Sequence, residues 1–266
     1  MGESPAAEAA EIKISFAGAE AGAAFEALAL DRDEARHRVI HFWDRPERSA
    51  GDGVALPLLD RGIILRLRRD NEELETKRDA DMTVKLRPCP ALPTPWRESR
   101  EGEDWEFRIE EDRTGPAFEA MVSASLEAEG KFGSALEAEA GSPDRMLIEP
   151  QLELLGLLES LELLDLSDAG GPGEDRFDGL TALGPVHAAK WKEEWDGLPG
   201  TVAIEEWTTG QGLRFLEVSV RTAIAEAAEV QERLGRALRE RDISPPAFGE
   251  TKTRAVMIAL ARTVRL

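Results

Sequence analysis

Hydrophobic and polar residues alternate in several short segments of this chain, a pattern that predicts β-strands with one apolar and one polar face. Eight segments fit this pattern: Glu11–Phe16, Arg38–Trp43, Gly62–Arg69, Met82–Arg87, Trp105–Glu111, Val186–Lys192, Thr201–Thr208 and Arg214–Val220. Segments rich in Ala, Glu and Leu predict helices at Ala19–Leu30, Glu149–Leu166, Thr222–Arg241 and Lys252–Leu266, the second of them either continuous or broken at Gly156. Phe118–Leu126 fits either a strand or a helix. This order predicts an antiparallel α+β fold.

The chain of 266 residues shows no internal repeat and no segment that resembles a linker. We therefore expect a flexible tail over residues 1–8 and a single domain over residues 9–266. The segment Ser49–Pro57 is expected to be a loop. The single cysteine, Cys89, has no partner for an internal disulfide, which indicates a reducing compartment and hence a cytoplasmic protein. We expect a monomer or a homodimer.

Basic residues stand two positions apart on three of the predicted strands. Residues at this spacing share one face of a strand, and the pairs are Arg66 with Arg68, Lys85 with Arg87, and Lys190 with Lys192. In an ordinary sheet the polar face is solvated. The net charge of −20, however, leads us to expect a solvated face that is mainly acidic. The clustering of positive charge therefore predicts an enclosed site for a phosphate-type anion.

The same net charge argues against nucleic acid and anionic membranes as partners, because both are repelled by an acidic surface. Glutamates occupy further polar positions of the predicted strands, at Glu11, Glu205 and Glu217. Carboxylate oxygens are the ligands that Mg²⁺ or Mn²⁺ prefers, and such an ion would bridge protein and phosphate.

Several segments recur in the order of one known family: EIKISF, HFWDRP, LLDRGIILRLRR, TVKLRP, VAIEEW, RFLEVSV and KTRA. They span Glu11 to about Ala255, and the pair LLDRGIILRLRR and TVKLRP is the most specific. In these segments the chain resembles the CYTH superfamily, or triphosphate tunnel metalloenzymes, which includes class IV adenylate cyclases, thiamine triphosphatases and inorganic triphosphatases. The resemblance implies an eight-stranded antiparallel β-barrel with outer helices, whose interior binds a triphosphate with the help of a divalent metal.

The resemblance also implies roles for individual residues. The phosphate-binding positions would be Arg66, Arg68, Lys85, Arg87, Lys190, Lys192 and Lys252. The metal-binding positions would be Glu11, Glu205 and Glu217, with Glu206 as an alternative to Glu205, and Lys13 would help to activate water. Two departures concern the metal: Ala9 and Ser219 stand where the family carries carboxylates.

Three functions follow from these observations. The first is a metal-dependent phosphohydrolase that acts on a triphosphate or polyphosphate compound with Mg²⁺ or Mn²⁺. The second is a binding domain that retains the anion site without hydrolysis, because fewer carboxylates remain to replace the water shell of a metal ion. The third is an adenylate cyclase.

Overall fold

The computed structural model describes residues 6–49, 53–70, 78–114, 120–132, 143–164, 177, 179–246 and 251–264. The long strands are β1 (Ala9–Ala17), β2 (Arg36–Asp44), β5 (Ile63–Asp70), β6 (Arg78–Leu86), β8 (Trp105–Thr114), β9 (Met121–Phe132), β10 (Thr181–Glu193), β11 (Val202–Thr209) and β12 (Arg214–Thr222). The helices are α1 (Gly18–Ala27), α2 (Pro57–Asp60), α4 (Glu149–Ser160), α5 (Ala227–Arg239) and α6 (Lys252–Ala261). All eight predicted strands and four predicted helices are confirmed, with shifted ends.

The long strands form one closed β-barrel with the order β1-β12-β11-β10-β2-β5-β6-β9-β8. The ring closes because β1 pairs antiparallel with β12 on one side and parallel with β8 on the other. The prediction of eight antiparallel strands is therefore wrong in detail: the described residues form nine barrel strands, and the sheet is mixed. The additional strand is β9, which includes most of the undecided segment Phe118–Leu126.

The parallel pair follows from the strand count. Neighbouring strands can alternate in direction all the way round a ring only if their number is even. With nine strands, at least one neighbouring pair must run parallel, and here this pair is β1 and β8.

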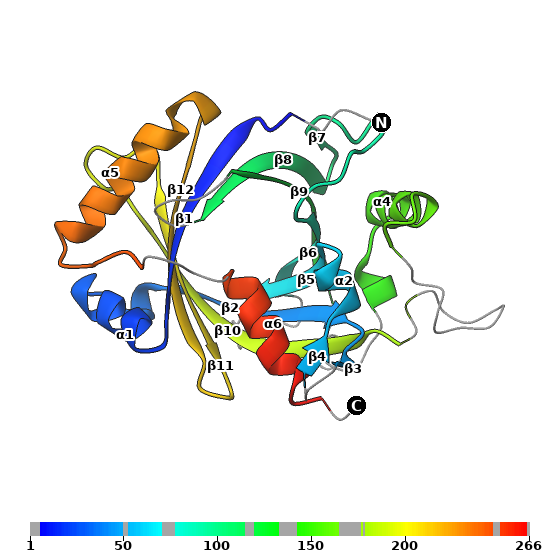
Figure 1. The fold of residues 1–266 in the computed structure, drawn as a ribbon, viewed down its shortest axis with the longest axis horizontal. Helices are drawn as coiled ribbons and strands as arrows, with labels where there is room; N and C mark the ends of the chain where they lie inside the picture. Colours follow the sequence, from blue (N-terminus) through cyan, green and yellow to red (C-terminus); the bar gives the residue numbers. More distant parts are fainter. Residues whose placement is uncertain are drawn as a thin grey trace.

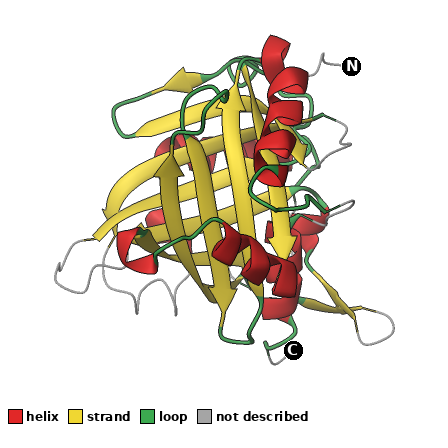
Figure 2. Ribbon diagram, turned by 90° about the vertical axis from the view of Figure 1, so that its left-hand side faces the viewer, coloured by secondary structure: helices red, strands yellow, loops and turns green. Residues whose placement is uncertain are grey.

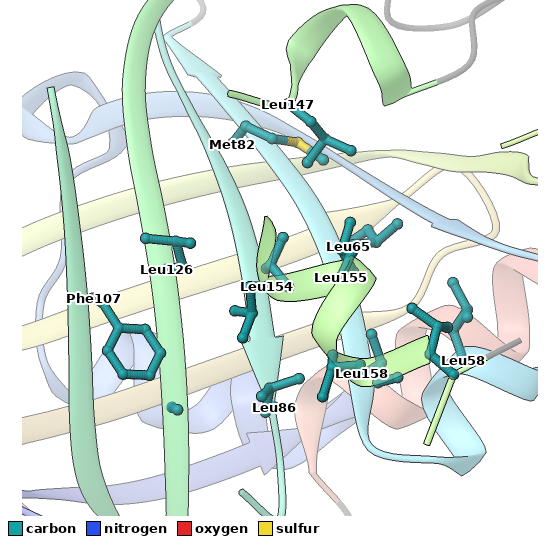
Figure 3. Close-up of a cluster of buried hydrophobic side chains, with 14 of the residues drawn as sticks. Leu58, Leu65, Met82, Leu86, Phe107, Leu126, Leu147, Leu154, Leu155 and Leu158 are labelled. Atoms are coloured by element: carbon teal, nitrogen blue, oxygen red, sulfur yellow. The ribbon is translucent and has the colours of Figure 1, made fainter. Parts of the chain in front are cut away.

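The apolar face of the barrel wall points outward and is covered by helices (Figure 1). The leucines of α4 pack on Leu65, Met82 and Leu126 (Figure 3), while α1 and α5 cover the wall formed by β1, β11 and β12. The strands form a curved layer with helices against it (Figure 2). Burial of these apolar side chains on the outside leaves the alternate positions of each strand for the lumen.

Helix α6 packs differently from the other helices. Its residues Val256, Met257 and Leu260 contact a cluster of strand residues that share the lumenal face: Ile40, Phe42, Ile64, Val186, Ala188, Trp207 and Phe215. One part of the lumen is thus filled by apolar side chains, and α6 lies across it (Figure 1). Charged lumenal residues lie directly beside this apolar cluster, since Arg66 pairs with Phe42 and Lys85 with Ile64.

Smaller differences from the sequence prediction lie in the connections. The predicted loop Ser49–Pro57 includes part of a two-stranded sheet of β3 (Glu47–Ser49) and β4 (Gly53–Ala55). Short 3-10 turns occur at Arg32–Glu34, Pro143–Met146 and Ile224–Glu226, and a two-residue strand β7 (Arg100–Glu101) extends the sheet beside β8. Within the described ranges, every helix is too short or too polar to cross a lipid bilayer.

Candidate anion site in the barrel lumen

The basic residues singled out on β5 and β6 face the lumen. Leu65 and Leu67 belong to the outer core under α4, so Arg66 and Arg68 on the same strand point to the other side. In β6, Val84 and Leu86 are buried in the same outer core, and Lys85 therefore faces inward as well. The alternation of β5 and β6 thus places cations on the inner wall.

Three of the inward-facing cations meet at one buried carboxylate, that of Asp112 on β8. Its side chain lies 3.0 Å from Lys13 Nζ, 3.2 Å from Lys85 Nζ and 3.2 Å from Arg87 Nε. Asp112 is only 1% exposed. We call this group, Asp112 with Lys13, Lys85 and Arg87, the Asp112 cluster. It joins β1, β6 and β8 across the seam where the barrel closes.

Three members of the Asp112 cluster, Asp112, Lys13 and Lys85, have shifted pKa values. Burial by itself raises the pKa of Asp112, but Lys13, Lys85 and Arg87 outweigh it and hold that pKa well below its usual range. Burial lowers the pKa of Lys13, yet Glu11, at 2.7 Å, and Asp112 reverse this and raise it above the usual range. For Lys85, burial and the nearby Lys13 leave a lowered pKa. Lys13 is therefore an ammonium ion in this arrangement.

Arg68 has its own counter-ions. Its guanidinium contacts Asp81 at 2.7 Å and Glu127 at 2.6 Å, across β6 and β9. Arg38 on β2 also reaches Asp81, at 3.5 Å. The charge of Arg68 is thus balanced within the barrel wall.

Arg66 and Lys190 differ from these cations. Within the described part of the chain neither has a carboxylate within 4.0 Å, and Arg66 donates one hydrogen bond, to Thr83 Oγ1 at 3.3 Å. The Nε atom of Arg66 is shielded from solvent without a hydrogen-bond partner. Burial, with Arg68 nearby, lowers the pKa of Arg66 to about 10, and burial also lowers the pKa of Lys190. These two groups carry positive charge that the wall leaves without a contacting counter-ion.

Lys252, the first residue of α6, reaches into the lumen between two glutamates. Its Nζ lies 2.7 Å from Glu205 and 3.1 Å from Glu217, which are paired on the adjacent strands β11 and β12. We call these three residues the Lys252 cluster. Burial raises the pKa of Glu205, but Lys252 outweighs it and lowers that pKa below the usual range. Lys252 is held by carboxylates in this structure.

The three glutamates considered as metal ligands are not brought together. Glu205 and Glu217 hold Lys252, whereas Glu11 forms an ion pair with Lys13. Glu206, the alternative to Glu205, lies on the opposite face of β11, where it is 2% exposed and binds Arg32 and Arg214. The geometry therefore gives no support for Glu206 as a ligand in the lumen.

Lys192, one of the predicted phosphate-binding residues, lies near the end of β10 and is exposed.

Three acidic residues that organise the site were missed from the sequence. Asp112 continues the lumenal series Glu106, Arg108 and Glu110, but the predicted strand ended one residue short of it. Glu127 lies on β9, beyond the undecided segment, and Asp81 lies directly before the predicted strand Met82–Arg87. Extension of the alternation by one or two residues would have found Asp112.

A pocket of about 480 Å³ opens at one end of the barrel. It is lined by Arg36, Arg38, Ala80, Asp81, Asp104, Glu129 and Gly130. These residues lie near the starts of β2, β6 and β8 and near the end of β9, whereas α6 packs toward the opposite ends of β2 and β5. Arg66 and Lys85 are not among the lining residues. We interpret the pocket as the entrance to the lumen.

Comparison with known proteins supports the fold. No protein-family model and no curated protein sequence matches the chain. The solved structure of a "putative adenylate cyclase" from Bacillus halodurans has 15% identity, covers 96% of this chain and 98% of its own, and gives a TM-score of 0.50. Another "putative adenylate cyclase", from Vibrio parahaemolyticus, has 11% identity, covers 94% and 98%, and gives a TM-score of 0.41. The first likeness shows a shared fold and is compatible with the CYTH-type barrel expected from the sequence motifs.

Proposed function

We propose that the barrel lumen binds the phosphate chain of a small molecule that carries a triphosphate or polyphosphate group. The observation that carries this proposal is Arg66, a lumenal guanidinium with no contacting carboxylate among the described residues. Its buried Nε still lacks a hydrogen-bond acceptor. A buried donor without an acceptor costs free energy, and a phosphate oxygen would satisfy it.

Other lumenal cations add to this positive charge. Lys85 and Arg87 share one carboxylate with Lys13, and Lys190 faces Glu205 without an ion pair. Several phosphoryl groups in a chain carry several negative charges, so they match a row of cations better than a single carboxylate does. Because the chain as a whole carries a charge of −20, an anion would gain binding energy only inside such a local cluster.

Binding is better supported than the other two predicted functions. Hydrolysis would need a base or a metal to activate water, and Lys13, the residue considered for this role, is an ammonium ion with a raised pKa. Phosphohydrolase activity with Mg²⁺ or Mn²⁺ stays a prediction, and so does cyclase activity. The experiment described next also measures these two activities.

The experiment is a titration of the purified protein with tripolyphosphate, followed by calorimetry and by the thermal unfolding temperature. We expect micromolar binding, on the order of 8 kcal/mol, and a rise in unfolding temperature. Parallel incubations with tripolyphosphate, ATP and thiamine triphosphate, with and without Mg²⁺ or Mn²⁺, measure released phosphate and cyclic AMP. Absence of any stabilisation by tripolyphosphate in the wild-type protein would overturn the proposal.

A double variant tests the location of the site. Arg66→Met with Lys85→Met removes two lumenal charges, and we expect it to abolish the stabilisation by tripolyphosphate. The matched control, Arg61→Met with Arg236→Met, removes two charges from exposed positions. Equal losses in both double variants would mean that the anion binds by overall charge and not in the lumen.

A further inference from the structure

The side chains around the Lys252 ammonium, which we call its seat, form a cation site. The side chain of Lys252 is only 4% exposed, and its Nζ contacts one oxygen of Glu205 and one of Glu217. On a further side the Nζ lies 4.0 Å from the centroid of the Trp207 ring. Two carboxylates and an aromatic face thus surround a single positive charge.

The chemistry of this seat suits an ammonium group better than a divalent metal. Mg²⁺ requires about six oxygen ligands at roughly 2.0–2.1 Å in octahedral geometry. An indole face supplies no oxygen, but it attracts an ammonium ion through its ring electrons. The Trp207 ring therefore occupies a side of the seat where a hard metal ion would need a ligand or a water molecule.

The remaining carboxylates do not complete a metal site. The second oxygen of Glu217 accepts a hydrogen bond from Ser15 Oγ at 2.8 Å, and Glu11 is engaged by Lys13. Ala9 and Ser219 provide no carboxylate at the positions where the family resemblance implies one. Across the described ranges, no group of three or more His, Cys, Asp or Glu side chains is placed to hold a metal ion. The residues present do not fit the divalent metal expected from the sequence.

We propose that the Lys252 ammonium is a built-in cation that takes the place of a divalent metal in this lumen. The helix that packs its apolar residues into one part of the lumen also delivers this charge, since Lys252 begins α6. The consequence, that phosphate binding is independent of Mg²⁺ and Mn²⁺, rests on the function proposed above. The occupancy of the seat itself does not depend on phosphate.

The test is a titration of the protein alone with Mn²⁺, without any phosphate compound, followed by calorimetry and by the paramagnetic signal of free Mn²⁺. We expect the wild-type protein to bind no Mn²⁺ more tightly than about 1 mM. Lys252→Met keeps an unbranched side chain without the ammonium group and frees Glu205 and Glu217, so it should bind Mn²⁺ at least about tenfold more tightly than wild type. The control is Arg254→Met on the same helix; the side chain of Arg254 is 42% exposed and pairs with Asp60, and its loss should leave Mn²⁺ binding unchanged.

One equivalent of Mn²⁺ bound tightly by the wild-type protein would overturn the proposal, and this result needs no variant that might unfold. A folded Lys252→Met variant, checked by circular dichroism, with no gain in Mn²⁺ binding would overturn it as well. In a separate assay the stabilisation of wild type by tripolyphosphate should persist in EDTA. Failure of all tripolyphosphate binding would overturn the proposed function and leave the Mn²⁺ result standing.

Discussion

Two clusters of charged side chains share the lumen with opposite balances of charge. In the Asp112 cluster three cations contact one carboxylate, whereas in the Lys252 cluster two carboxylates contact one cation. The first is built from barrel strands and their immediate extension, and the second is completed by a residue of α6. The comparison shows two different balances of charge in one barrel: the Asp112 cluster has more cations than carboxylates, and in the Lys252 cluster the helix supplies one cation to two carboxylates.

The difference matters because a buried charge is stable only when it is paired. The cations of the Asp112 cluster are only partly paired, because three of them share one carboxylate, and the proposed function assigns the anion to this part of the lumen. The carboxylates of the Lys252 cluster already have their cation. Each of the following predictions tests one side of this comparison.

The largest effect is expected from Asp112→Asn. The substitution leaves Lys85 and Arg87 without their contacting carboxylate, and removal of one partner from a buried ion pair costs about 3–5 kcal/mol. Urea denaturation measures this loss of unfolding free energy, and tripolyphosphate should restore part of it by supplying a new anion.

The control for this prediction is Glu111→Gln, at the preceding position of the same strand, which removes an ion pair with Arg113 on the other face. It should cost less than about 1 kcal/mol. If Asp112→Asn were as mild as its control, Asp112 would not be the counter-ion that holds the three cations together.

An intermediate effect is expected from acid. The pKa of Asp112 and of Glu205 are both lowered in the folded protein from ordinary values of 3.8 and 4.5. The unfolded chain therefore binds more protons in the acid range, and the free energy of unfolding should fall as the pH drops below about 4.5. Denaturation curves between pH 3 and pH 6 measure this slope.

In the same experiment, Glu205→Gln distinguishes how much each of the two clusters contributes to the acid dependence of stability. It removes the part of the acid dependence that belongs to the Lys252 cluster and leaves the part that belongs to Asp112. We therefore expect a shallower fall in stability with acid than in wild type. An unchanged slope would show that the pairing of Glu205 with Lys252 contributes nothing to stability.

The smallest effect on stability is expected from Arg66→Met. Because Arg66 has a lowered pKa and no contacting carboxylate among the described residues, its replacement should be neutral or stabilising by up to about 1 kcal/mol. The same variant should lower the affinity for tripolyphosphate by at least about tenfold. A clear loss of stability together with unchanged affinity would mean that Arg66 is a structural residue.

Much of the barrel could be predicted because strand alternation is a local property. A repeat of two residues is visible within each segment, and it correctly separated Leu65 and Leu67 from Arg66 and Arg68. The ninth strand escaped because Phe118–Leu126 is too short to distinguish a strand from a helix, and β9 extends beyond it to Phe132. Asp112 escaped because a strand end is less well defined than its centre.

The sequence by itself determined which residues alternate, and hence that a row of cations shares one face of the strands. Only the tertiary structure decided which cations are already paired. Lys13 meets Asp112 across 99 positions of the chain, and Lys252 meets Glu205 across 47. Such pairs depend on how the ring closes between β1 and β8 and on where α6 enters the lumen. No local pattern reports these distances, because they are set by the packing of the whole barrel.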